Sequence, residues 1–187
     1  MRVNRRHAVR LLTVLTVGLG PSVAFTRRAV AQSSTYNMDN HRAVYLLKFA
    51  RYTKWPDGTF ANDKEPFRIY ILGKDPFGKN ADIIRSKDVN GRKLDIQCFD
   101  NVEDVKNSQI LFIVSKDKKA FQKILKAVEN TSILTVAESE GFLDANGMIN
   151  LFVENDRLQF DINLAAAKKA NLKLDSEMLK LAKTVKT

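Results

Sequence analysis

The sequence is poor in the residues that form disulfide bonds and metal sites. Its 187 residues include one cysteine, Cys98, and two histidines, of which only His41 lies beyond the first 31 residues. A single cysteine excludes an intramolecular disulfide. Zinc and copper centres need several histidine, cysteine or carboxylate ligands that converge, and calcium loops have their own spacing, which is missing here. The sequence therefore predicts no metal site.

Glycine is also scarce, and familiar catalytic motifs are missing. No serine occupies a G-x-S-x-G turn, so nucleophilic catalysis would depend on His41. The one suggestive glycine cluster, Gly73 to Gly78, follows a strand pattern and opens a helix pattern, where backbone N–H groups could hold an anion. Strand-to-helix turns need glycine and proline for geometry alone, and we favour that interpretation. Elimination thus favours binding or regulation over catalysis, with no catalytic residue and no cofactor.

The first 31 residues have the features of a cleavable signal peptide. Four arginines and no acidic residue lie in residues 1–10, and an apolar run of fifteen residues follows at 11–25. That run is too short to span a bilayer as a helix, so an uncleaved anchor or a core helix is the weaker alternative. Small residues allow cleavage after Ala24 or, as we prefer, after Ala31. We expect a signal peptide at 1–31, a periplasmic domain at 32–187, and export by the Sec or the twin-arginine route.

Removing the signal peptide changes the charge of the protein. Six of the 31 basic residues and none of the 21 acidic residues lie in residues 1–31, which leaves 25 basic residues and a net charge of +4. The remaining lysines are scattered, without a basic stripe that carries aromatic side chains. This composition does not indicate nucleic-acid binding.

Hydrophobic periodicity in residues 32–187 predicts strands that alternate with helices. The apolar run QILFIV at 109–114 is typical of a strand that is buried on both faces. Residues 154–156 (END) predict a tight hairpin turn, because asparagine and aspartate tolerate a positive φ. We expect a single three-layer α/β domain, with a mixed, mostly parallel sheet flanked by helices and a C-terminal edge hairpin. The expected helices span 38–54, 75–86, 116–129, 164–170 and 176–185, and the expected strands span 67–72, 93–99, 109–114, 133–137, 148–153 and 157–162.

Three features of the sequence each allow two interpretations. Trp55 and its aromatic neighbours could bind a ligand or cap the core. The apolar segment 141–152 could dock a partner or pack against the final helices. Cys98 lies in an alternating segment, where we favour a buried, inert thiol over an intermolecular bridge.

Nine short segments form an ordered series along residues 32–187. They are FARYTKWP at 49–56, ILGKDPFG at 71–78, VNGR at 89–92, ILFI at 110–113, ILTV at 133–136, NGMIN at 146–150, LQFDIN at 158–163, LKLDS at 172–176 and LKLA at 179–182. In their order and spacing, these segments resemble the YfiR family of periplasmic regulators, over nearly all of residues 32–187.

The resemblance implies a periplasmic repressor rather than an enzyme. Members of the family hold the periplasmic sensory domain of a membrane-bound diguanylate cyclase inactive, and so limit cyclic-di-GMP synthesis and biofilm formation. An outer-membrane lipoprotein can sequester the repressor. The expected partners are therefore this sensory domain, such a lipoprotein and a second copy of the chain as a homodimer, but no nucleic acid. The alternative is a small-ligand-binding sensory module, since other members are fused to histidine kinases.

The resemblance also assigns residues. It places partner contacts at Ile149, as an apolar anchor, at Asp161, as a polar orienting contact, and at the neighbouring Met148. Strand alternation by itself puts Phe160 and Ile162 on the face opposite Asp161. Two positions that carry disulfide cysteines in the best-studied branch are Leu143 and Asn150 here, which excludes redox control through that bridge. Asn146 stands where many relatives have a second glycine. The speculative ligand-binding residues of the alternative are Trp55, Gly73, Phe77 and Gly78.

Overall fold

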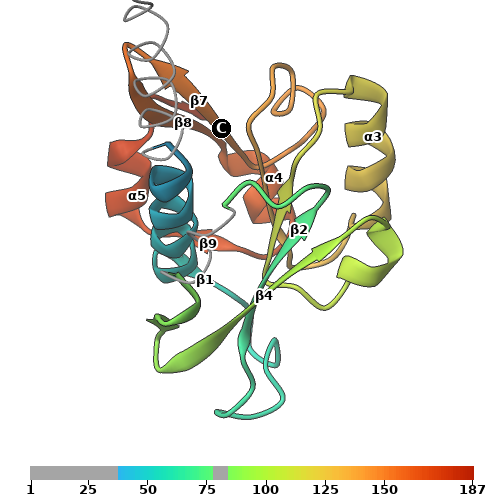
Figure 1. Ribbon diagram of the computed structural model, residues 1–187, viewed down its shortest axis with the longest axis vertical. Helices are drawn as coiled ribbons and strands as arrows, with labels where there is room; N and C mark the ends of the chain where they lie inside the picture. The colour runs from blue at the N-terminus through green and yellow to red at the C-terminus, as the bar shows by residue number, and fades with distance from the viewer. Residues whose placement is uncertain (1–37, 78–83) are drawn as a thin grey trace, which may run out of the picture. The chain divides into compact units, whose positions relative to one another are not determined.

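The computed structural model describes residues 38–77 and 84–187 (Figure 1). The predicted signal peptide, with its cleavage sites after Ala24 and Ala31, lies outside these residues. The described residues belong to one compact unit, Thr35–Thr187.

The unit is built on a mixed sheet with the strand order β10-β8-β7-β6-β5-β2-β4-β3. The neighbours from β4 to β7 in this order pair in parallel, β8 runs antiparallel to β7, and β10 runs parallel to β8. The predicted mostly parallel sheet is thus confirmed. Its strands are β2 (Phe67–Leu72), β3 (Asp88–Val89), β4 (Arg92–Phe99), β5 (Ile110–Ile113), β6 (Leu134–Ala137), β7 (Ile149–Glu154), β8 (Arg157–Asn163) and β10 (Thr184–Lys186); β1 (Thr53–Lys54) and β9 (Lys173–Leu174) form a separate antiparallel pair.

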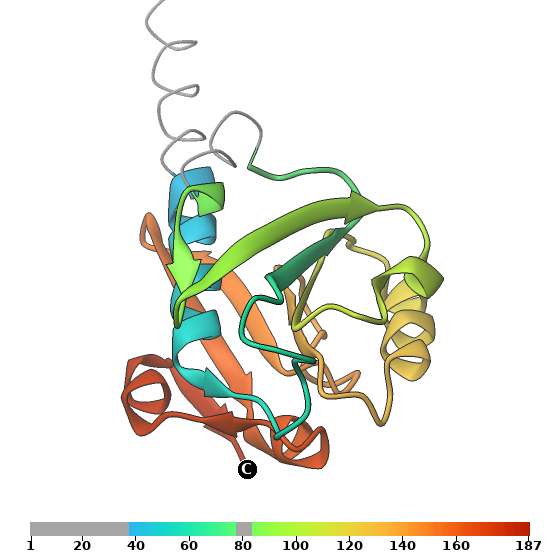
Figure 2. The same ribbon diagram turned by 90° about the horizontal axis from the view of Figure 1, so that it is seen from below.

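Helices lie on both faces of the sheet (Figures 1 and 2). Residues 38–51 are helical, and α3 (Lys118–Ala127), α4 (Leu164–Lys169), α5 (Ser176–Leu181) and the short 3-10 helix η2 (Val102–Val105) follow. Asp117, Asn163 and Asp175 begin the three α-helices, and each side chain accepts a hydrogen bond from a backbone N–H of the first turn.

Two apolar cores, one on each face, hold the three layers together. Ile69 and Ile71 of β2 pack in the core that includes Phe49 of the N-terminal helix. Tyr70 and Leu72 pack in the other core, which includes Phe121 of α3. Successive side chains of a strand point to opposite faces, so the part of β2 that is covered on both faces, Ile69 to Leu72, carries apolar or aromatic side chains. The predicted three-layer α/β domain is confirmed.

The C-terminal helix is shorter than the periodicity predicts. We expected a helix over 176–185, but α5 ends at Leu181, and Thr184–Lys186 form β10. The backbone of this segment pairs with Asp161–Asn163 of β8, and the N–H of Lys183 donates to the carbonyl of Phe160. The open edge of β8 offers these hydrogen bonds, which a frayed helix end lacks. The hairpin therefore lies one strand in from the sheet edge.

The predicted helix over 75–86 is only partly described. Residues 75–77 are not helical, because Asp75 accepts a hydrogen bond from the N–H of Phe77 and forms a turn. Residues 84–85 are helical, and residues 78–83 lie outside the described part.

Cys98 corrects the expectation of a buried thiol, since its side chain is exposed. Leu94 and Ile96 of β4 pack in the core, but the neighbouring strand β3 pairs only with Arg92 and Lys93, at the start of β4. Among the described residues, no strand covers the edge of β4 at Cys98. An intermolecular bridge is therefore sterically possible.

The exposure of Cys98 favours its reaction with alkylating reagents, whereas the raised pKa of its thiol slows that reaction. Partial desolvation, helped by the carboxylates of Asp75 and Asp100, raises the pKa of the thiol, so the folded protein holds less thiolate than the unfolded chain at pH 8. We expect iodoacetamide to alkylate Cys98 completely, but more slowly than in urea. The rate should keep rising with pH above the ordinary thiol pKa of about 8.5. Complete protection of the thiol would contradict its exposed position.

Candidate functional site

The hairpin formed by β7 and β8 is defined by its turn. Asn155 and Asp156 both have positive φ values, 50° and 58°, as a two-residue hairpin turn requires. This turn sets the register that pairs Ile149 with Ile162 and Asn150 with Asp161. The turn prediction is confirmed.

The two faces of the hairpin differ in chemistry. One face packs in the core through Ile149, Leu151, Phe160 and Ile162. The opposite face, which we call the hairpin face, consists of Asn150, Phe152, Glu154, Gln159 and Asp161, all half-buried. Asp161 thus lies opposite Phe160 and Ile162, as alternation predicts. A recess of about 560 Å³ lies beside this face, bordered by Glu138–Glu140, Phe152, Asp161 and Lys183.

Asp161 is the unusual residue of this recess. Its Oδ1 atom is enclosed by protein and has no hydrogen-bond partner among the described residues. The neighbouring polar groups already have other partners. Asn150 accepts a hydrogen bond from the N–H of Ser139, and Glu138 pairs with Arg42. Lys183 pairs with Glu154 and lowers the pKa of that carboxylate. Its ammonium also lies 5.5 Å from the centre of the Phe152 ring.

Met148 and Ile149 do not reach the hairpin face. Ile149 has no exposed surface and Met148 is 8% exposed. Met148 lines a different hollow of about 530 Å³, which also borders Lys126 of α3 and Lys169 of α4. The structure therefore separates these two residues from Asp161: Ile149 lies in the core, and Met148 borders the other hollow.

The loop before β7 is held by a buried ring. Gly147 packs so closely on Phe142 that an added Cβ would lie 2.3 Å from a ring carbon. Asn146, where relatives have a second glycine, has a φ of 70° and so adopts a conformation that asparagine tolerates. Leu143 packs against the second core.

Trp55 belongs to a second site, at the start of β2. Its ring meets Phe67 edge-to-face with centroids 5.0 Å apart, and Phe60 tilts over Phe67 at 6.1 Å. The guanidinium of Arg92 lies 4.0 Å from the centre of the Phe60 ring. These side chains, together with Thr53, line a cavity of about 430 Å³ that we call the aromatic pocket.

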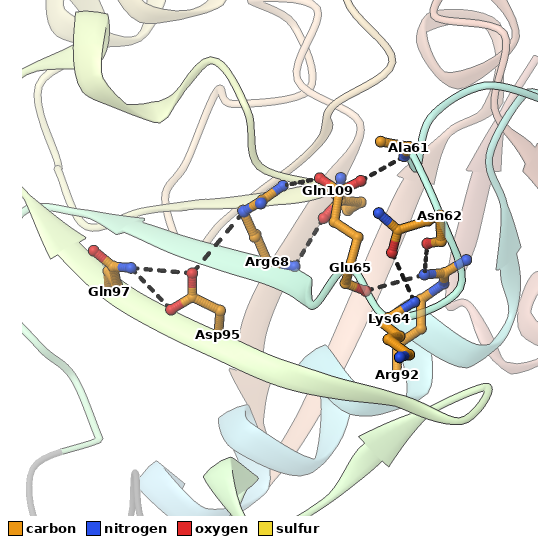
Figure 3. Close-up of polar contacts among 9 residues, drawn as sticks. All are labelled: Ala61, Asn62, Lys64, Glu65, Arg68, Arg92, Asp95, Gln97 and Gln109. Atoms are coloured by element: carbon orange, nitrogen blue, oxygen red, sulfur yellow. Dashed lines mark hydrogen bonds and ion pairs between the residues drawn. The ribbon is translucent and has the colours of Figure 1, made fainter.

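A polar network holds one wall of this pocket (Figure 3). Arg92 Nη1 donates to the carbonyl oxygens of Asn62 and Glu65, at 2.7 and 3.0 Å. The Glu65 carboxylate accepts from the Ala61 N–H and from Arg68, and both bonds lower its pKa. The loop over residues 61–65 is therefore tied to β4 and β2. Arg92 lies in the VNGR segment, but local patterns do not indicate its role in this network, because its partners lie 27–30 residues away.

The other speculative ligand residues lie elsewhere. Gly73 follows the opposite end of β2; its φ is 110°, and an added Cβ would lie 2.9 Å from the Val114 carbonyl oxygen, so turn geometry accounts for this glycine. Phe77 is buried and stacks on Phe112, with centroids 6.1 Å apart. Gly78 lies outside the described residues. Trp55, Gly73 and Phe77 therefore do not form one site.

Within residues 38–77 and 84–187, no cluster of three or more histidine, cysteine or carboxylate side chains could hold a metal ion. In the same residues, no helix combines the length and the hydropathy needed to cross a membrane.

The mixed sheet with helices on both faces makes the described part of the chain a single α/β domain. A family model described as YfiR/HmsC-like matches residues 39–183, and the chain belongs to this family. Members of this family are periplasmic regulators of diguanylate cyclase signalling.

One solved structure supports the fold, and the fold alone. A conserved domain protein from Vibrio cholerae O1 biovar El Tor matches with a TM-score of 0.50 and 11% identity, over 79% of this chain and 60% of that chain. The ABC domain in complex with L-Trp from Streptococcus pneumonia matches with a TM-score of 0.47 and 7% identity, over 64% and 55%. The chain thus spans less than two thirds of either matched chain. No curated protein matches it.

Proposed function

We propose that this protein is a periplasmic repressor that binds the sensory domain of a membrane-bound diguanylate cyclase through its hairpin face. The observation that carries this proposal is the enclosed, unpaired carboxylate oxygen of Asp161, beside the half-buried ring of Phe152. A buried acceptor without a partner is costly, and a partner's donor would remove that cost. Membership of the YfiR/HmsC-like family supports the choice of partner.

The charges of the recess specify what the partner presents. Glu138 and Glu154 are neutralised by Arg42 and Lys183, whereas Asp161 has no ion-pair partner among the described residues. A basic side chain of the partner would complement Asp161, and an apolar neighbour would cover Phe152. Ile149 and Met148 contribute from the buried side of the hairpin, where they fix the register and the position of β7.

Two further partners extend the proposal. An outer-membrane lipoprotein that competes for the hairpin face would release the cyclase, and export behind a cleaved signal peptide at 1–31 would bring the three proteins into one compartment. A homodimer through the same face would also occupy Asp161 and compete with the cyclase.

Charge reversal at Asp161 tests the proposal directly. In the host, Asp161→Arg is expected to raise cyclic-di-GMP to the level of the gene deletion, because truncating a buried interfacial charge pair costs about 2–5 kcal/mol, and reversal weakens binding by about 100-fold or more. Phe152→Ala should give a smaller rise. Cyclic-di-GMP is measured by mass spectrometry, and circular dichroism of each purified variant confirms that it is folded.

Asp104→Arg is the matched control, because Asp104 is an exposed aspartate on η2, away from the hairpin. It should repress normally. Full repression by a folded Asp161→Arg protein would exclude the hairpin face as the repressing surface, and an unchanged cyclic-di-GMP level on deletion would exclude the function itself.

A further inference from the structure

We infer that the outer face of α3 is a docking surface for a membrane that contains anionic phospholipid. This face, which we call the lysine face, consists of Lys118, Lys119, Lys123 and Lys126. It lies apart from β7 and β8 in both views (Figures 1 and 2), and the inference does not depend on the proposed repressor function. Three observations carry it: the crowding of these lysines, the lack of acidic residues within α3, and the cost of the lysines to the helix.

The lysine face gathers positive charge that is otherwise spread along the chain. Four of the ten residues of α3 are lysines, and all four side chains are exposed. At about 3.6 residues per turn they fall on one side of the helix. Phe121, Ile124 and Leu125 fall on the opposite side and pack in the core. α3 therefore has a local excess of charge, although residues 32–187 carry a net charge of only +4.

Acidic side chains do not balance this charge within the helix, because α3 contains none. Asp117 caps the start of α3 through its side chain, and Glu129, beyond the end of α3, pairs with Lys169 of α4 at 2.8 Å. The neighbouring η2 carries Glu103 and Asp104, so the excess is confined to α3 itself. The lysine face therefore keeps a positive potential that attracts an anionic partner.

The placement of three of these lysines destabilises the free helix. Lys118 and Lys119 lie in the first turn of α3, where the helix dipole is positive and a cation is unfavourable. Lys119 and Lys123 are four positions apart, so two like charges are neighbours on the helix surface. Glutamate at such positions would stabilise the helix. An anionic partner would offset this repulsion.

The choice of lysine favours a lipid surface as that partner. Protein interfaces are enriched in arginine, tyrosine and tryptophan and depleted in lysine. A bilayer spreads its negative charge over a surface, and flexible ammonium groups can follow that charge without a fixed geometry. Members of the family are periplasmic and thus lie between two membranes. Because the apolar side chains of α3 point inward, we expect peripheral binding without insertion.

Vesicle sedimentation with the protein purified from its own host tests the inference. We expect the protein to bind vesicles made of equal parts of phosphatidylglycerol and phosphatidylcholine, but not vesicles of phosphatidylcholine alone. Raising the salt concentration from about 0.1 M to about 1 M should release the protein, because the screening length falls from about 10 Å to about 3 Å.

A triple variant, Lys118→Gln with Lys119→Gln and Lys123→Gln, separates binding from structure. It should bind the anionic vesicles about 100-fold more weakly, since each lysine near such a surface contributes about fivefold in affinity. Without vesicles, its melting temperature should rise by about 2–4 °C, because the variant loses the unfavourable charges of the first turn and one like-charge pair. Glutamine has nearly the helix propensity of lysine.

The matched control is a second triple variant, Lys64→Gln with Lys74→Gln and Lys93→Gln. These three lysines are exposed and lie in three separate parts of the chain, so the control has the same net charge as the α3 variant. It should bind the anionic vesicles like the wild type.

Three results would overturn the inference. The first is a lack of binding to the anionic vesicles at about 0.1 M salt. The second is an equal loss of binding in both triple variants, which would show that net charge alone is responsible. The third is unchanged vesicle binding by the α3 variant. If that variant also failed to repress the cyclase in the host, the lysine face would be a contact for an acidic protein instead.

Discussion

Replacing Ile149 with aspartate is expected to unfold the domain. Ile149 has no exposed surface and lies in β7 between Val136 of β6 and Ile162 of β8. Aspartate would bury a charge without a partner at this position. We expect a loss of more than about 4 kcal/mol, a large part of the about 5–15 kcal/mol that stabilises a typical domain. Urea denaturation followed by circular dichroism measures this loss.

Phe152→Asp is the control for this variant, because it adds the same charge to the same strand on the half-buried hairpin face. It should stay folded in buffer. Ile149→Val should cost only about 0.5–1.5 kcal/mol. A folded Ile149→Asp protein with normal stability would contradict the core position of Ile149. If the Ile149→Asp protein unfolds as expected, its loss of repression would reflect unfolding and not a lost contact with a partner.

Gly147→Ala is expected to destabilise the protein by about 1–3 kcal/mol, the usual cost of overpacking a core. The added Cβ would lie 2.3 Å from the ring of Phe142, and that ring is fully buried and packs edge-to-face on Phe121 at 5.4 Å. The ring therefore has little room to move. For a domain of this size, the melting temperature should fall by about 2–4 °C for each kcal/mol.

A double variant identifies the cause of this loss. Phe142→Ala removes every ring atom that the added Cβ would meet, so adding Gly147→Ala to it should cost much less than adding Gly147→Ala to the wild type. Calorimetry of the four proteins in this cycle measures the coupling. Equal costs in both backgrounds would show that the ring contact is not responsible.

Local patterns predicted the centre of the sheet and the hairpin turn well. ILFI at 110–113 needs an apolar residue at every position because both faces of β5 are covered, and that requirement is visible in the sequence. The Asn155–Asp156 turn depends on two adjacent residues alone. By contrast, β10 forms because β8 presents an open edge, and no property of residues 184–186 reveals that edge.

The candidate sites show the same division. Alternation correctly placed Asp161 opposite Phe160, and it could also have placed Ile149 with Leu151 on the inner face. The family resemblance assigns Ile149 to a partner contact, whereas alternation indicates that its side chain faces the core, where the structure places it. The aromatic pocket joins Phe67 to Arg92 through the pairing of β2 with β4, a long-range register that local periodicity does not contain.

The small β1–β9 pair has a consequence for the order in which the chain folds. It joins Thr53 to Leu174, residues more than 100 positions apart, and the Asp175 N–H also donates to the Tyr52 carbonyl. Contacts of such long sequence separation carry a large loop-closure entropy and form slowly. They cannot form until nearly the whole chain has been synthesised. A chain that is synthesised from its N-terminus therefore forms the β1–β9 pair last. Thr53 becomes enclosed only at that stage of folding.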